Sequence, residues 1–178
     1  FTMWVYTTSA IATHHYGLTP GDTSSETFNN AGDWVGILFG IYNAVSAVYA
    51  LFIHRFASRT SRKFVHIFSL VAGGIGLLSM YVIKDPNLLW IPMLGVGLAW
   101  GSILSIPYSL LVDKLPSHKM GVYMGIFNFF IVIPQIINGI VGGMIVKSAF
   151  NNYAISYVML GGVFFIIAAI LTLRVKEP

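Results

Sequence analysis

Five long apolar runs, none containing Asp, Glu, Lys or Arg, constrain this chain more than any other feature of its sequence. They cover residues 34–53, 64–83, 88–112, 120–146 and 153–173. A helix needs roughly 20 mostly apolar residues to cross the hydrocarbon core of a bilayer. Each run therefore predicts a membrane-spanning helix. A sixth apolar segment, residues 1–16, is shorter, and we expect it to be a span truncated at its front.

Other ways of burying these runs fit the sequence less well. The strands of a membrane barrel would show alternation of apolar and polar residues over about 10 positions, which is absent here. A soluble domain carries about 25% charged residues, whereas this chain has only 9%. The ten Lys and Arg residues stand between the apolar runs, and a nucleic-acid binder would gather them on one wetted face. We therefore predict an all-α, polytopic membrane protein with six transmembrane helices and no nucleic-acid partner.

The distribution of Lys and Arg predicts how the spans are oriented, because cytoplasmic loops are enriched in both. If the loop 54–63 is cytoplasmic, eight bases lie on that side: Arg55, Arg59, Arg62, Lys63, Lys114, Lys119, Arg174 and Lys176. Only Lys84 and Lys147 lie on the other side. Both ends of the chain are then expected to be cytoplasmic, and the polar loop 17–33 faces outward.

Three amides in the fifth run are the first candidates for a binding site, because polar side chains at membrane depth are costly. Asn128, Gln135 and Asn138 fall within an arc of about 80° on a helix. Pro134 removes one backbone donor between them. Amides both donate and accept hydrogen bonds, which suits a hydroxyl-rich solute. They either line a cavity or bond to neighbouring helices.

Aromatic side chains and one further amide complete the set of candidate binding residues. Trp100 and Tyr108 in the fourth run are suited to form an aromatic platform for a sugar ring, or else pack against lipid and neighbouring helices. Trp4 and Tyr6 are amphipathic residues of the first span, and Asn43 lies in the second run. Asn43 shares a face with Gly36, Gly40 and Ala47, a pattern typical of close helix packing. Gly97 and Gly101 show the same pattern in the fourth run.

No catalytic motif is found in the sequence. There is no HExxH pair, no nucleophile elbow and no carboxylate pair within the apolar runs. His14 and His15 are adjacent, so they point to different sides of a helix and cannot chelate a metal as an i, i+4 pair would. We therefore expect no enzyme activity, no cofactor and no metal site.

Two segments resemble a known transporter family. Ser58-Arg59-Thr60-Ser61-Arg62-Lys63 resembles the cytoplasmic Asp-Arg-x-Gly-Arg-Lys signature of the major facilitator superfamily. Met124-Gly-Ile-Phe-Asn128 with Ile131-Val-Ile-Pro-Gln135 is similar to a segment of plant sucrose transporters and of the bacterial glycoside-pentoside-hexuronide:cation symporters. Ile106-Pro-Tyr108 resembles an element of the same branch. The resemblance covers essentially the whole chain.

The resemblance implies the C-terminal half of a twelve-helix fold, with the N-terminal six-helix half missing. It implies rocker-switch transport of a disaccharide or glycoside between the two halves, coupled to a cation, expected to be a proton. Arg59, Arg62 and Lys63 would form a gating loop at the cytoplasmic mouth. The alternatives are a major facilitator transporter of another small solute, a membrane-embedded enzyme, or a six-span structural or accessory protein.

Overall fold

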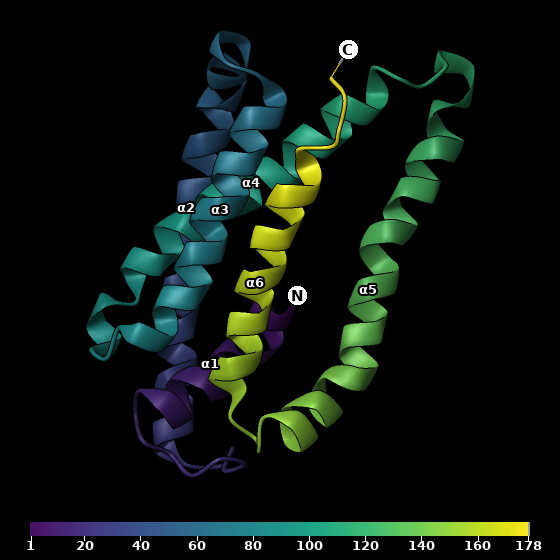
Figure 1. The fold of residues 1–178 in the computed structure, drawn as a ribbon. Helices are drawn as coiled ribbons and strands as arrows, with labels where there is room; N and C mark the ends of the chain where they lie inside the picture. Colours follow the sequence, from purple (N-terminus) through teal and green to yellow (C-terminus); the bar gives the residue numbers. More distant parts are fainter. Residues whose placement is uncertain (178) are drawn as a thin grey trace.

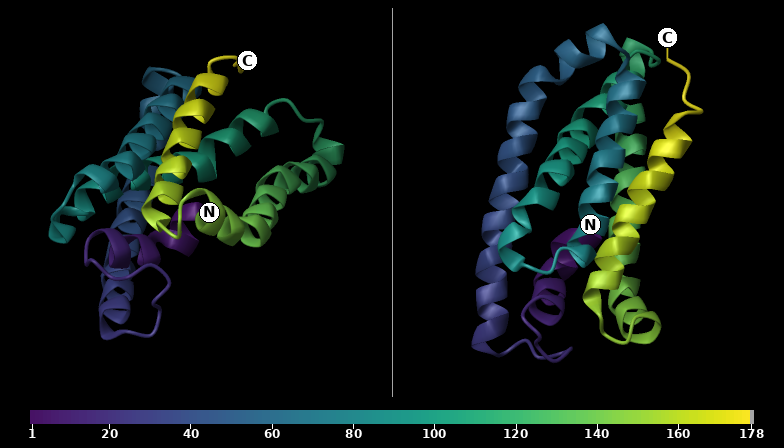
Figure 2. Two further views of the ribbon diagram at one scale, coloured as in Figure 1. Left: turned by 60° about the horizontal axis from the view of Figure 1, so that its bottom comes forward. Right: turned by 60° about the vertical axis from the view of Figure 1, so that its left-hand side comes forward.

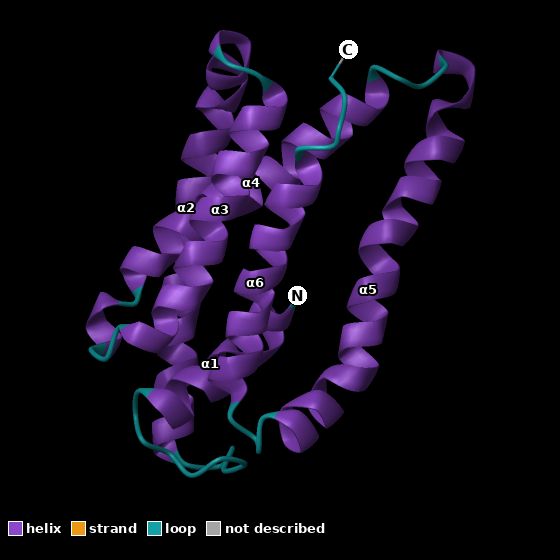
Figure 3. Cartoon of the chain, in the orientation of Figure 1, coloured by secondary structure: helices purple, strands orange, loops and turns teal. Residues whose placement is uncertain are grey.

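Six α-helices make up most of the chain in the computed structural model, which describes residues 1–177 (Figure 1). They are α1 (Thr2–His14), α2 (Glu26–Arg59), α3 (Arg62–Val82), α4 (Trp90–Val112), α5 (Met120–Ala149) and α6 (Ala154–Thr172), with two 3-10 turns, η1 (Pro86–Leu88) and η2 (Ser117–Lys119). No strand occurs among the residues described (Figure 3). The predicted all-α class is confirmed.

Five of these helices are long and apolar enough to cross a membrane, namely α2, α3, α4 together with η1, α5 and α6. The first predicted span is a helix as well, but α1 has only 13 residues. At 1.5 Å per residue it is about 20 Å long, whereas the hydrocarbon core is about 30 Å thick. Among the described residues, therefore, five full spans accompany one short helix.

Two predicted loops are shorter than expected, because their polar residues continue the helices beyond the apolar layer. The loop 17–33 ends early, since the Ser25 hydroxyl caps α2 by accepting the N–H of Phe28 at 3.3 Å. At its other end α2 continues to Arg59. Ser61 then caps α3 by accepting the N–H of Phe64 at 3.0 Å. The prediction of a loop over 54–63 is thus wrong for all but the residues between α2 and α3.

The close packing of α2, α3, α4 and α6 depends on glycines. A Cβ atom on Gly97 would lie 2.7 Å from the carbonyl oxygen of Tyr42, so α4 approaches the backbone of α2. One on Gly162 would lie 2.9 Å from the carbonyl oxygen of Gly74, where α6 meets α3. α3 packs extensively against both α4 and α6, which the two views of Figure 2 show side by side with it. The predicted packing role of Gly97 is confirmed.

The packed face of α2 is not the face that its small residues predict. A Cβ atom added to Gly36 or Gly40 would meet nothing within 4 Å, and Asn43 is exposed. The buried face instead carries Val35, Leu38 and Tyr42, among others. Within the described chain, the expected seam of Gly36, Gly40, Asn43 and Ala47 is therefore an open surface rather than a helix contact.

One helix stands apart from the rest. α5 runs along the side of the bundle in Figures 1 and 2, joined to α4 and α6 at its two ends. It has no extensive contact with any other helix, and only Gly142 and Val146 of its 30 residues are buried. A helix that is apolar all round and sparsely packed leaves room beside it for lipid, a partner or a solute.

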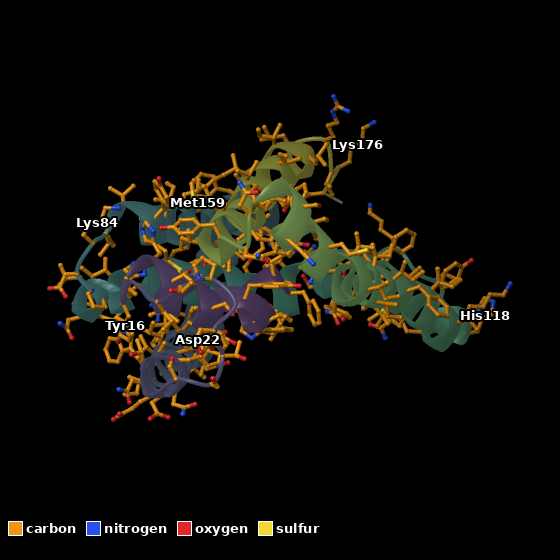
Figure 4. All side chains as sticks on the ribbon, turned by 90° about the horizontal axis from the view of Figure 1, so that it is seen from below. Tyr16, Asp22, Lys84, His118, Met159 and Lys176 are labelled. Atoms are coloured by element: carbon orange, nitrogen blue, oxygen red, sulfur yellow. The ribbon has the colours of Figure 1, made fainter. Side chains whose placement is uncertain are left out.

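The connections fall at two ends of the molecule, as the alternation of spans predicts. The α2–α3 and α4–α5 connections lie at the same end as the C-terminus, which we call the basic end (Figure 1). Figure 4 looks from the other end, where Tyr16, Asp22 and Lys84 lie. Phe1 is part-way along the bundle in Figure 1. The cytoplasmic location of both termini stays a prediction.

Candidate functional site

A cavity of about 630 Å³ lies between α5 and the other helices. Its size falls within the range of about 300–1,000 Å³ typical of small-molecule sites. All six helices contribute, and the lining residues are Thr2, Met3, Trp4, Tyr42, Leu77, Val96, Trp100, Ile103, Leu104, Tyr108, Ile131, Pro134, Gln135, Ile137, Asn138, Val141, Ile145, Tyr157, Gly161, Phe164 and Phe165, together with Phe1. No acidic, basic or histidine side chain is among these. The cavity is thus mostly apolar, with a few hydroxyls and amides.

Five of the predicted binding residues line this cavity. Gln135 and Asn138 reach it from α5, Trp100 and Tyr108 from α4, and Trp4 from α1. The two amides are three residues apart, so they lie on neighbouring turns of one helix face. Pro134 also lines the cavity, and α5 continues as a helix through it. The structure therefore brings together amides and aromatic rings from three separate segments.

The aromatic wall of the cavity is built around Trp4. The rings of Trp4 and Trp100 meet edge to face, with centroids 4.8 Å apart and planes at 84°. The indole N–H of Trp4 donates to the hydroxyl of Tyr42 at 2.8 Å. Edge-to-face packing and this hydrogen bond together fix the orientation of the indole. The wall offers flat apolar faces and one phenol hydroxyl.

Elsewhere in the lining, an amide is bonded to a second phenol. The Tyr157 hydroxyl donates to the side-chain oxygen of Asn138 at 2.6 Å. The ring of Tyr157 is buried and packs edge to face on that of Tyr6, with centroids 5.0 Å apart. Gly142 makes room for both phenols, since a Cβ atom there would lie 2.7 Å from the Tyr6 hydroxyl. α1 and α6 thus both contact α5 at this point.

Three predicted binding residues lie outside the cavity. Asn128 is exposed and accepts a hydrogen bond from the Tyr108 hydroxyl at 3.2 Å. Asn43 donates to the carbonyl of Phe39 in its own helix at 2.8 Å. Tyr6 is not a lining residue, and its ring packs on that of Tyr157. None of these three residues lines the cavity.

Tyr42 and Tyr157 are polar lining residues that the sequence pattern does not single out. Both are phenols within apolar helices, and both are only 4% exposed. Tyr42 is the immediate neighbour of Asn43, so the predicted inner face of α2 differs from the observed one by about 100°. For Tyr42, the signal available in the sequence is a phenol beside an amide. Nothing in the sequence decides which of two adjacent residues faces inward.

At the basic end, the three predicted gating residues behave differently. Arg62 forms an ion pair with Asp113 across 2.6 Å and donates to the carbonyl of Ser109 at 3.3 Å, which joins α3 to the end of α4. The Lys63 ammonium donates to the carbonyls of Leu173 and Val175 after α6. Arg59 is exposed at the end of α2. Arg62 and Lys63 thus belong to helix α3 rather than to a loop.

The opposite end is fastened by two histidines at the end of α1. His14 contacts the Tyr153 hydroxyl at 2.8 Å and the carbonyl of Tyr81 at 3.0 Å. His15 donates to the carbonyls of Met80 and Ile83, each at 3.1 Å. Met80 and Tyr81 belong to the last turn of α3, whose carbonyls have no partner within that helix, and Ile83 is the C-cap residue. The histidines therefore cap α3 and tie α1 to it.

Comparison with known proteins agrees with this architecture. Residues 1–178 match the family model described as Major Facilitator Superfamily. Neither a curated protein nor a solved structure matches the chain. The match spans the whole sequence, and it accompanies five apolar spanning helices and a cavity between them. The chain therefore belongs to the Major Facilitator Superfamily of membrane transporters.

Proposed function

We propose that this chain is the C-terminal half of a proton-coupled sugar transporter, and that its solute binds in the cavity beside α5. The observation that carries the proposal is the lining itself: amides and phenols set among aromatic rings, with no ionisable acid, base or histidine side chain among the described lining residues. Such a surface suits an uncharged solute that offers hydroxyls on one side and an apolar ring face on the other.

The proposed mechanism rests on the family and on the sparse packing of α5. In a rocker-switch transporter, two six-helix halves move against one another around a fixed solute site. An N-terminal six-helix half would close the open side of the cavity, and by resemblance to the sugar:cation symporters it would supply a carboxylate that binds the coupled proton. α5 contacts its own half near Asn128, near Asn138 and Gly142, and at the buried Val146. It is therefore a helix whose position the solute and the other half would influence.

The direct test is uptake by the full-length protein in proteoliposomes. Radiolabelled sucrose, maltose and methyl glucoside would be offered with and without an inwardly directed proton gradient. We expect one of the disaccharides to accumulate, and its accumulation to require the gradient. Uptake that only equilibrates the sugar across the membrane would contradict proton coupling. Absence of uptake for every sugar would contradict a sugar as the substrate.

A second candidate, transport of another small uncharged solute, is favoured by the apolar character of most lining residues, such as Leu104, Ile131 and Phe164. It predicts that the sugars fail to bind while an uncharged amphipathic solute does. Both candidates place the solute against Gln135. Gln135→Leu in the same vesicles should therefore weaken uptake of whichever solute is transported.

A further inference from the structure

Two adjacent histidines at the end of α1 are not equally satisfied. His14 has a partner at each ring nitrogen, the Tyr153 hydroxyl at 2.8 Å from Nδ1 and the Tyr81 carbonyl at 3.0 Å from Nε2. His15 bonds through Nε2 alone, to two carbonyls at the end of α3. Its Nδ1 is shielded from solvent and has no partner within the described residues. α1 packs on α2 and α6 but has no extensive contact with α3, so these bonds are its main tie to α3.

The geometry determines which nitrogen of His15 carries the hydrogen. Carbonyls only accept hydrogen bonds, so the Nε2 that faces two of them is the N–H, and Nδ1 of the neutral ring carries none. A proton added to Nδ1 would make a buried donor without an acceptor, which is costly. His15 is therefore neutral in this arrangement, which we call the tied form of α1.

The charges around His15 oppose an added proton as well. Titratable or charged side chains meet the histidine pair from the end of α3 and from the start of α6, namely Tyr81, Lys84 and Tyr153, and within the pair the two rings meet edge to face. The Lys84 ammonium lies 3.4 Å from Nε2 of His14. No carboxylate pairs with either histidine in the part of the chain that the structure describes. A proton on His15 would thus add a second positive charge near Lys84 without an acid to balance it.

We propose that His15 is a proton-binding site, and that its protonation releases the end of α1 from α3. An exposed histidine titrates at a pH of about 6.5. The tied form, which keeps His15 neutral, is favoured above that pH. It loses stability as the pH falls below that value, because the released form binds the proton more tightly. By the same linkage, formation of the tied form expels the proton.

Release would change how the solute cavity is held. α1 is a single helix of 13 residues, and Thr2, Met3 and Trp4 at its other end line the cavity. This regulation rests on the proposed function, and it assigns a proton-binding group to this half of the transporter. The end of the molecule that carries His15 is viewed in Figure 4 and is predicted to face outward. With an inwardly directed proton gradient, it is the more acidic end.

The distance between the ends of α1 and α3 measures release directly. Thr19, which follows α1, and Val82, in the last turn of α3, both have exposed side chains. Spin labels on Thr19→Cys and Val82→Cys would be compared in the full-length protein with its other cysteines replaced. The comparison is made at about pH 7.5 and about pH 5.5, on either side of the titration of histidine. A proton that binds only the released form raises the ratio of released to tied molecules about tenfold between these two values. We expect the longer distance to gain population accordingly.

Replacements of single histidines assign the response to one of them. In His15→Gln the amide N–H donates to the same carbonyls and does not titrate, so the tied distance should persist at both pH values. His15→Asn, whatever its distance, should likewise not respond to acid. His14→Gln should keep the response, because the Tyr153 hydroxyl donates to a neutral His14 and accepts from a charged one, so His14 is satisfied in both forms. His66→Gln, at a buried histidine bonded to Ser102, is the matched control and should keep it too.

An unchanged distance in the parent protein, or an acid response that survives in His15→Gln or His15→Asn, would overturn the proton site. Loss of the response in His14→Gln or His66→Gln would overturn its assignment to His15. All of these results leave sugar uptake, and with it the proposed function, standing. Absence of sugar uptake beside an intact acid response would instead overturn the proposed function and leave the proton-binding site at His15.

Discussion

Gln135 and Asn128 show how far single residues of the site follow from the sequence. Both are amides on one face of a membrane-depth helix, which correctly marks α5 as a wall of the cavity. They are seven residues apart, or about 10 Å along the axis, and the cavity reaches α5 only between Ile131 and Ile145. Depth along the helix depends on how α5 meets α4. The angular positions of polar residues around one helix do not show how far along the helix axis the cavity extends.

The two amides should therefore differ when they are removed. Gln135→Leu should weaken binding of the transported sugar by about 5- to 150-fold, because a hydroxyl loses its partner in a site shielded from water. Asn128→Ala should stay within a few-fold of the parent, since Asn128 is not itself a lining residue of the cavity. Equilibrium binding to purified protein, normalised to the folded fraction, measures both. An equal loss in the two variants would place the solute further toward the basic end.

At the scale of helices, type and order follow from the apolar runs, while boundaries and faces do not. The ends of α2 lie further out than predicted, because Ser25 caps it early and its polar last turns remain helical up to Arg59. The prediction of its packed face is wrong because Gly36 and Gly40 carry the small-residue pattern on the open side. On α4 the same pattern correctly marks a contact, since Gly97 meets the backbone of α2.

The contact at Gly97 gives a stability prediction. Gly97→Ala should destabilise the protein by about 1–3 kcal/mol, since the new methyl group would overlap the carbonyl of Tyr42. Gly121→Ala, where a Cβ atom meets nothing within 4 Å, should be neutral or stabilising because alanine favours helix. Thermal unfolding in detergent compares the two. A Gly97→Ala variant as stable as the parent would mean that α2 and α4 separate without cost.

The ion pair between Arg62 and Asp113 gives a prediction about transport rather than stability. Both side chains are partly exposed, at 30% and 42%, and such pairs contribute only about 0–1 kcal/mol to folding. Asp113→Asn should thus leave the melting temperature and the solute affinity nearly unchanged. We expect it to slow transport, because the pair joins α3 to the end of α4 at the mouth. Unchanged turnover in proteoliposomes would contradict a gating role.

For the reversed pair, Arg62→Asp with Asp113→Arg, we expect partial recovery of the rate, because the attraction across the same two helices is restored. Arg59→Ala serves as the comparison, since Arg59 is exposed at the end of α2. Its removal should change turnover less than the removal of Asp113.

At the scale of the whole molecule, the sequence predicts which connections share an end, because spanning helices must alternate. The membrane side of each end is a separate prediction, based on the excess of Lys and Arg at the basic end. Ser24→Cys and Thr60→Cys in the full-length protein test the membrane side of each end. Thr60 is chosen rather than the adjacent Ser61, because the Ser61 hydroxyl caps α3. An impermeant reagent should label the cysteine at position 24 from outside intact cells, and the one at position 60 only after the cells are opened. Labelling of both from outside would reject the topology.

Binding of the solute in the cavity beside α5 is the claim on which the other proposals depend. The most direct measurement is the alkylation rate of Gln135→Cys in the full-length protein, with and without saturating sugar, beside Asn43→Cys on the open face of α2. We predict that sugar slows alkylation at position 135 severalfold and leaves position 43 unchanged. Equal rates at position 135 with and without a sugar that the protein demonstrably transports would contradict solute binding at this site.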